Sequence, residues 1–207
     1  MPYVPVFLIF VAAAVFFAVV TRFKAKGYGK DFEAYIEEEK KANAVWKEPI
    51  PTGDMFAPDM SLFPVAADDA GDSAVLRRQR EVMARAAEKM MRFDEPLSNA
   101  ELKLKYGTAN LENIAEYEDN FFRFIYTVNS WAEALLDTGD ETAAETVLYA
   151  GVMSFADTSK TYTMLADIYH KNGRAEDIRW LYGVIGNRNF PAKEKALEYV
   201  ELKMEKE

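Results

Sequence analysis

An uninterrupted apolar run near the N-terminus sets the first limit on how this chain can fold. Residues 4–20, VPVFLIFVAAAVFFAVV, carry no charge and no side-chain hydrogen-bonding group. A helix of about 20 residues spans the roughly 30 Å hydrocarbon core of a bilayer. The stretch from Tyr3 to Arg22 has this length. The sequence therefore predicts a transmembrane helix, with residues 1–22 as a membrane anchor.

The charges that flank this run predict its orientation. No Lys or Arg precedes it, and four follow within ten residues, namely Arg22, Lys24, Lys26 and Lys30. Basic residues favour the cytoplasmic side. We therefore expect a single-pass protein of the cell membrane, with the N-terminus outside and the C-terminal domain in the cytoplasm. A cleaved signal peptide of an exported protein and a buried core helix are the alternatives.

The composition excludes most kinds of catalytic and metal-binding site. The 207-residue chain has no Cys and one His, which excludes disulfides, cysteine metal sites and a thiol nucleophile. It contains no dinucleotide, P-loop, nucleophile-elbow or zinc-protease motif. Asp68, Asp69 and Asp72 lack the spacing of a calcium loop. We expect no cofactor, no metal and no small-molecule substrate, and not an enzyme, unless an acid pair lies buried. The net charge of −9 argues against nucleic-acid binding.

Changes in composition divide the rest of the chain. Residues 23–46 are helix-prone and form a juxtamembrane helix in our reading, with a narrow apolar stripe at Phe32, Tyr35 and Ile36. Residues 47–73 hold four prolines and six acids against one Lys, which predicts an acidic linker. Within it, residues 55–65 (MFAPDMSLFPV) are apolar enough to lie as a strap on the domain, which is the alternative to a free tether.

A helical domain is expected over residues 74–207. It begins with a basic helix over residues 74–93, whose six basic and two acidic side chains give it a local charge of +4. We expect one apolar side, formed by Leu76, Met83, Ala87 and Met90, and either internal docking or an acidic partner. Ser98 and Glu101 form a capping-box pattern that predicts a short helix ending near Gly107. A separate helix over residues 110–117 should follow.

Two helical hairpins then follow at a fixed spacing. The patterns at residues 120–138 and 141–155 are separated by Gly139, those at 159–172 and 174–185 by Gly173, and these glycines are 34 residues apart. Glycine can take the positive φ that ends a helix. The overlay aligns Trp131 with Leu165, Ala132 with Ala166, Leu135 with Tyr169, Ala144 with Ile178, Leu148 with Tyr182, and Gly151 with Ile185. The aromatic side chains of this region are expected mainly in the core, namely Phe121, Phe122, Phe124, Tyr126 and Trp131.

This helix–turn–helix period resembles the tetratricopeptide repeat family. The resemblance covers about two repeats, clearest over residues 125–187, with a capping helix at 191–206. The sequence departs from the family pattern at Val128, at Ile178 and at Ala156-Asp157, where a bulky residue, a small residue and a Pro are usual. The resemblance implies an all-α fold, an α-hairpin array or α-solenoid, whose flanking helices complete the stack. A helix bundle without repeats is the alternative.

The resemblance also implies a binding surface. Family members hold a peptide on the inner face of the first helix of each repeat. On this chain that face consists of Tyr126, Asn129, Glu133, Asp137, Lys160, Thr163, Asp167, His170 and Lys171. A merely solvated helix surface is the alternative. The expected function is therefore a membrane-anchored adaptor or scaffold that binds a protein or peptide partner at the cytoplasmic face of the membrane. The alternative is a structural or assembly subunit of a membrane protein complex.

Overall fold

The computed structural model describes residues 32–66 and 73–204 of the chain. The predicted membrane span at residues 4–20 lies outside them. The described part is mostly helical, with one short antiparallel pairing of β1 (Met55–Phe56) with β2 (Met90–Met91), and this confirms the all-α class. Within residues 32–66 and 73–204, no helix combines the length and the apolar character that crossing a membrane requires.

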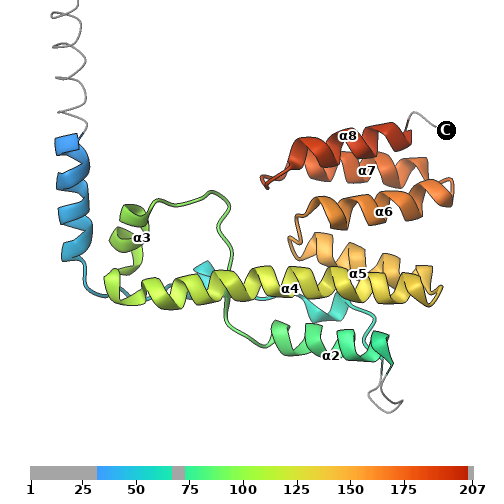
Figure 1. Ribbon diagram of the computed structural model, residues 1–207, viewed down its shortest axis with the longest axis horizontal. Helices are drawn as coiled ribbons and strands as arrows, with labels where there is room; N and C mark the ends of the chain where they lie inside the picture. The colour runs from blue at the N-terminus through green and yellow to red at the C-terminus, as the bar shows by residue number, and fades with distance from the viewer. Residues whose placement is uncertain (1–31, 67–72, 205–207) are drawn as a thin grey trace, which may run out of the picture. The chain divides into compact units, whose positions relative to one another are not determined.

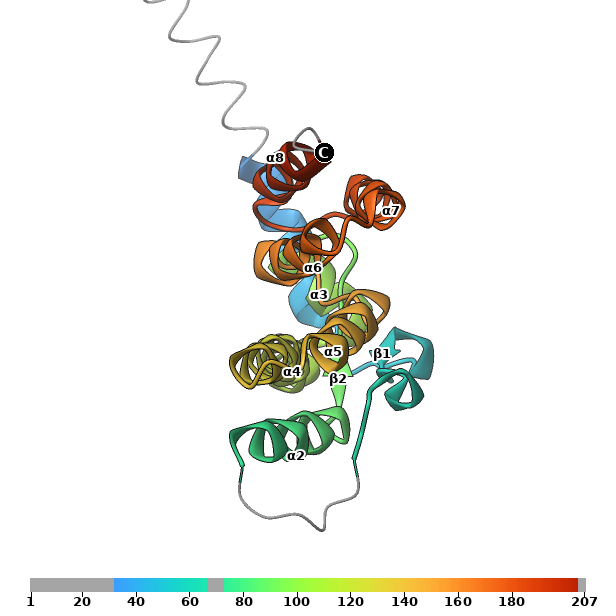
Figure 2. The same cartoon turned by 90° about the vertical axis from the view of Figure 1, so that its right-hand side faces the viewer.

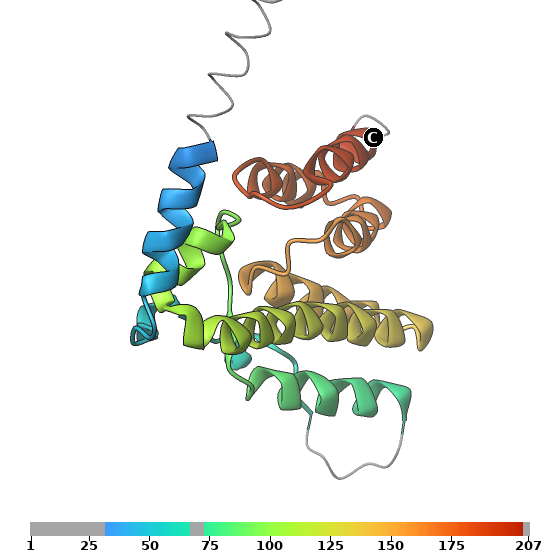
Figure 3. The ribbon, with the colours of Figure 1, turned by 60° about the vertical axis from the view of Figure 1, so that its left-hand side comes forward.

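The described residues divide into two compact units, and the first consists of residues 32–49 and Leu97–Leu111. Its helix over residues 32–44 lies beside α3 (Asn99–Tyr106), as Figure 3 shows. An ion pair of 2.8 Å between Lys103 and Glu39 joins these two helices. The predicted capping box opens α3, because Ser98 Oγ accepts from the Glu101 amide and the Glu101 carboxylate accepts from the Ser98 amide. These hydrogen bonds lower the pKa of Glu101.

A backbone ladder completes the first unit at the end of α3. The Thr108 and Ala109 amides donate to the carbonyls of Val45 and Trp46 over 3.0 and 2.9 Å, and η3 (Thr108–Asn110) follows. Gly107, with φ +82°, lies where the two segments meet. A Cβ at this position would lie 2.6 Å from Lys47 Cα. The close approach of the two backbones therefore requires glycine here.

The second unit, Ile50–Pro96 with Glu112–Glu207, is a row of helices in two layers. Figures 1 and 2 show one layer of α2 (Ala74–Ala86), α4 (Leu111–Asp137), α6 (Ser159–Lys171) and α8 (Lys193–Met204). The other layer holds α5 (Glu141–Met153) and α7 (Ala175–Gly186). Trp131, Leu148, Leu165 and Leu181 are fully buried and belong to one continuous core. Each helix of the row therefore buries its apolar face against its neighbours.

The two predicted hairpins have the same turn geometry. Gly139 and Gly173 both take positive φ, +82° and +64°. At the first turn the Asp140 amide donates to the Leu135 carbonyl, and at the second the Arg174 amide donates to the Tyr169 carbonyl, both over 2.9 Å. These pairs are also 34 residues apart, so local glycine and capping signals predicted both turns correctly.

Residues 55–65, which we call the strap, pack into the core of the second unit. Phe63 is 5% exposed; it stacks on Trp131 with ring centroids 6.2 Å apart and meets Phe124 edge-on. Phe56 lies edge-on to Phe121 at 5.0 Å. η2 (Met60–Leu62) contacts α5, so the strap extends the α5 layer of Figure 2. The acidic and Pro-rich composition predicted a linker, with a strap on the domain as the alternative to a free tether. Phe63 belongs to the domain core and Phe56 and Met60 pack against that core, so this segment is not a free tether.

The basic helix is shorter than predicted. α2 ends at Ala86, and Met90 and Met91 leave the helix to form β2, whose partners in β1 are Phe56 and Met55. Both methionines of β2 are fully buried. The predicted apolar side of the helix is also wrong, since Met83 is exposed while Gln79 and Val82 are buried. The reason is tertiary, because pairing with the strap converts the end of the expected helix into a strand.

The break predicted near Asn120 is also wrong. α4 is continuous from Leu111 to Asp137 and contains no Gly or Pro. Asn120 is buried, and its Nδ2 donates to the Lys89 carbonyl over 3.1 Å. Asn120 therefore lies within a helix and donates a hydrogen bond to a neighbouring segment of backbone, instead of beginning a new helix.

Candidate partner-binding site

The nine predicted binding residues do not form one surface. Asn129 is only 2% exposed; its Nδ2 donates to Thr158 Oγ1 over 3.1 Å, and its Oδ1 accepts from Thr161 Oγ1 over 2.9 Å. Thr158 is the N-cap of α6. Asn129 therefore fixes the start of α6, and its predicted contact with a peptide is incompatible with its burial.

The other three predicted residues of the first hairpin lie on the exposed side of α4. Tyr126 is 69% exposed, so its expected place in the core is wrong, and Asp137 is also exposed. Glu133 pairs with Lys160 of α6 at 2.7 Å, with both side chains half exposed. Thr163 donates its hydroxyl to the Lys160 carbonyl within α6. Glu133 and Lys160 are the predicted residues that an ion pair brings together.

Two predicted residues of α6, Asp167 and Lys171, pair with other helices. Asp167 accepts from Tyr199 Oη over 2.8 Å and pairs with Lys203 at 2.6 Å, so it serves the contact with α8. Lys171 pairs with Glu141 at the start of α5. His170 Nδ1 is buried and makes no hydrogen bond within the described residues. Packing of α6 on both sides, which the sequence did not reveal, separates these residues from the face of α4.

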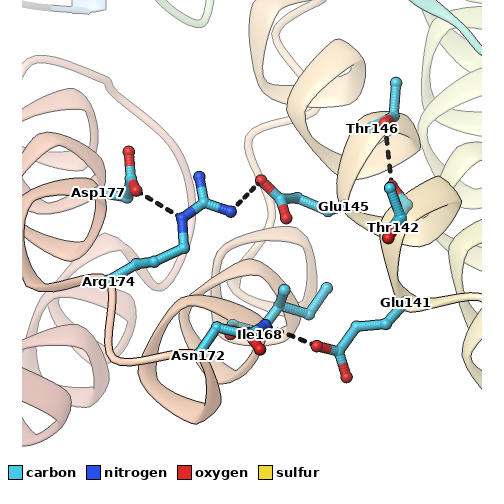
Figure 4. Close-up of polar contacts among 8 residues, drawn as sticks. All are labelled: Glu141, Thr142, Glu145, Thr146, Ile168, Asn172, Arg174 and Asp177. Carbon is cyan, nitrogen blue, oxygen red and sulfur yellow. Dashed lines mark hydrogen bonds and ion pairs between the residues drawn. The ribbon is translucent and has the colours of Figure 1, made fainter.

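A polar network near Lys171 holds the second hairpin to the first. Figure 4 shows Asn172 donating to Glu141 over 2.7 Å, and the Arg174 guanidinium lying between Glu145 and Asp177. Hydrogen bonds from Lys171 and Asn172 lower the pKa of Glu141. Hydrogen bonds to the two carboxylates raise the pKa of Arg174. These charged groups are matched to one another, so this network ties α5 to α6 and α7.

A small aromatic cavity lies elsewhere in the second unit, and we call it the Phe155 pocket. Its volume is about 120 Å³. α4 supplies Phe121, Phe122 and Ile125 to its walls, and the loops after α5 and α7 supply Phe155 and Phe190. Phe121 is buried, as predicted, but Phe122 is 49% exposed. The sequence signals missed this pocket, because its walls come from segments far apart in the chain.

Charged groups and backbone strain surround Phe155. The guanidinium carbons of Arg92 and Arg188 lie 3.9 and 4.1 Å from the centroid of its ring. Phe155 has φ +58°, which is costly for a bulky residue. The Asp157 side chain is 9% exposed, accepts from the Tyr162 hydroxyl, and lies 3.9 Å from Arg188 Nε. Strained backbone and buried carboxylates concentrate at functional sites, which makes the Phe155 pocket the best candidate site.

Asp157 is expected to make stability depend on pH. Burial raises the pKa of Asp157 above its usual 3.8, so the folded chain holds this proton more tightly than the unfolded chain does. The resulting stabilisation is complete below the unfolded pKa and is lost as pH rises through the folded pKa. Asp157→Asn keeps an acceptor for Tyr162 and removes the titration. In urea unfolding, the free energy of unfolding of the wild type should therefore rise relative to that of the variant as the pH is lowered from neutral. A difference between the two proteins that does not change with pH would contradict this.

The exposed surface of α4 beside the pocket is acidic and aromatic. Glu118 lines the pocket, and Phe122, Tyr126, Glu133 and Asp137 follow it at steps of four or seven residues, so that they share one face. We call these five residues the α4 face. Within residues 32–66 and 73–204, Glu118 and Asp137 have no hydrogen bond or ion pair. The arrangement can accept an apolar side chain in the pocket and positive charge along the helix.

Comparisons with protein-family models, with curated proteins and with solved structures found no match. The resemblance to the tetratricopeptide repeat family therefore depends on the 34-residue pattern of this chain alone.

Proposed function

We propose that this protein is a membrane-anchored adaptor with tetratricopeptide-like repeats, which binds a protein partner at the cytoplasmic face of the membrane. The observation that carries the proposal is the Phe155 pocket, open beside the exposed side chains of Phe122 and Tyr126. Partner sites are typically apolar, concave and rich in aromatic side chains. The apolar run at residues 4–20 supports the anchor, which would raise the effective concentration of a bound partner near other membrane proteins.

A second candidate is a subunit of a stable membrane complex. The observation that favours it is another exposed apolar surface, on α5 and α7. Tyr149 and Trp180 stack there with ring centroids 5.6 Å apart, and Met153 lies one turn further along α5. A subunit packed between others would cover both this surface and the α4 face, whereas an adaptor would leave the surface on α5 and α7 free.

Site-specific photo-crosslinking in intact membranes tests the adaptor. With the photoreactive residue at Tyr126, we expect a protein adduct that Phe122→Ala reduces at least roughly tenfold, because burial of one apolar side chain contributes about 1.5–3 kcal/mol. The matched position is Met153, where no adduct is expected. Equal adducts at both positions would favour the complex subunit. If no adduct forms at position 126 in the chain that keeps Phe122, the proposed function is contradicted.

A further inference from the structure

The charge left over at the Phe155 pocket is negative. Arg92 pairs with Asp94, and Arg188 lies beside Asp157, so each of the two guanidinium groups has a carboxylate close by. Glu118, which also lines the pocket, has no hydrogen bond or ion pair within the described residues. A ligand with a carboxylate would be repelled by Glu118, and an uncharged ligand would leave the charge of Glu118 unpaired. A cationic group beside the apolar side chain satisfies it.

The α4 face extends this requirement along the helix. Nineteen positions separate Glu118 from Asp137, which corresponds to roughly 28 Å along a helix. An extended peptide of about nine residues has a similar length. Between the two acids, Tyr126 presents an exposed ring of the kind that Lys and Arg side chains cover. Since Glu133 is already paired with Lys160, the face offers, among the described residues, the apolar pocket and the unpaired Glu118 near one end, the ring of Tyr126 further along, and the unpaired Asp137 at the other end.

We propose that the partner segment is a basic juxtamembrane segment of a membrane protein, about nine residues long, with one apolar side chain that enters the Phe155 pocket. This inference rests on the proposed function. Lys and Arg gather where membrane proteins enter the cytoplasm, so an adaptor anchored at that surface meets segments of this composition. Residues 22–30 of this chain, RFKAKGYGK, are an example of the class, with an apolar Phe among four basic residues.

Peptide binding to the full-length chain in uncharged phosphatidylcholine nanodiscs tests this inference. The probe is a fluorescent peptide, Lys-Lys-Lys-Ser-Phe-Ser-Lys-Lys-Lys. We expect binding that weakens at least roughly tenfold when the probe's Phe is replaced by Ser, and that disappears when its Lys residues are replaced by Glu. The double variant E118Q/D137N should bind about fivefold more weakly at low salt. At about 1 M salt, where the Debye length is about 3 Å, wild type and variant should converge.

The matched control is Glu176→Gln, which removes an exposed acid of α7 and should leave peptide affinity unchanged. Equal binding of the Lys and Glu probes, or an affinity that E118Q/D137N does not change, would overturn the basic-segment proposal. If the Tyr126 adduct nevertheless persists and still depends on Phe122, the adaptor function stands and its partner has another chemistry. If that adduct is absent too, both proposals fail.

Discussion

Replacing Gly107 by Ala is expected to disrupt the first unit. The new Cβ would lie 2.6 Å from Lys47 Cα and 2.8 Å from the Trp46 carbonyl carbon, so backbone must move. Movement breaks the hydrogen bonds from Thr108 and Ala109, each contributing about 1 kcal/mol. The φ of +82° with ψ of 153° is a backbone conformation essentially restricted to glycine, which adds about 1–3 kcal/mol for a residue with a Cβ. The total is about 3–5 kcal/mol, and hydrogen exchange at the Thr108 and Ala109 amides should accelerate by more than roughly a hundredfold.

Gly139→Ala is the control for this prediction. Gly139 has the same φ of +82°, but nothing lies within 4 Å of the position that its Cβ would take. The variant should therefore lose only the conformational part, about 1–2 kcal/mol. Similar exchange rates at Thr108 and Ala109 in Gly107→Ala and the wild type would show that the two backbone segments do not approach as described.

Replacing Phe63 by Ala is expected to destabilise the second unit by about 3–5 kcal/mol. The ring is buried between Trp131 and Phe124, and its loss leaves a cavity under the strap. Urea unfolding monitored by tryptophan fluorescence should reveal the change, since the buried Trp131 loses its stacking partner. The result would place the strap among the segments that hold the domain together.

Leu62→Ala is the matched control, one residue away. Leu62 is 36% exposed, so its truncation should cost less than about 1 kcal/mol. Equal losses for Phe63→Ala and Leu62→Ala would contradict the packing of the strap in the core.

The strap also connects the core to the candidate site. β1 of the strap pairs with β2, and Met91 of β2 and the following Arg92 line the Phe155 pocket. Phe56 of the strap lies 6.4 Å, ring to ring, from Phe155 itself. The stability of the strap and the shape of the pocket are therefore coupled, because the pairing of β1 with β2 both holds the strap and positions Met91 and Arg92 at the pocket.

Local signals in the sequence were sufficient for the helical hairpins. Ser98 with Glu101, Gly139 and Gly173 each act within one turn of chain, through a capping hydrogen bond or a positive φ, and each has its expected geometry. The 34-residue spacing follows from the same turns. By contrast, the extent of α2 and the continuity of α4 depended on distant partners, the strap for Met90 and the Lys89 carbonyl for Asn120.

For the candidate site too, some features could be predicted from the sequence and others depended on tertiary packing. The burial of Phe121 was expected from the sequence, and Tyr126 was assigned to a binding face through the resemblance, although its aromatic character also made it a core candidate. Tertiary packing alone decided that Asn129 is buried against α6, that Asp167 faces α8, and that Phe155 and Phe190 meet α4 around one cavity. The physical reason is range: capping and periodicity act over a few residues, whereas the walls of a pocket come from wherever the folded chain brings side chains together.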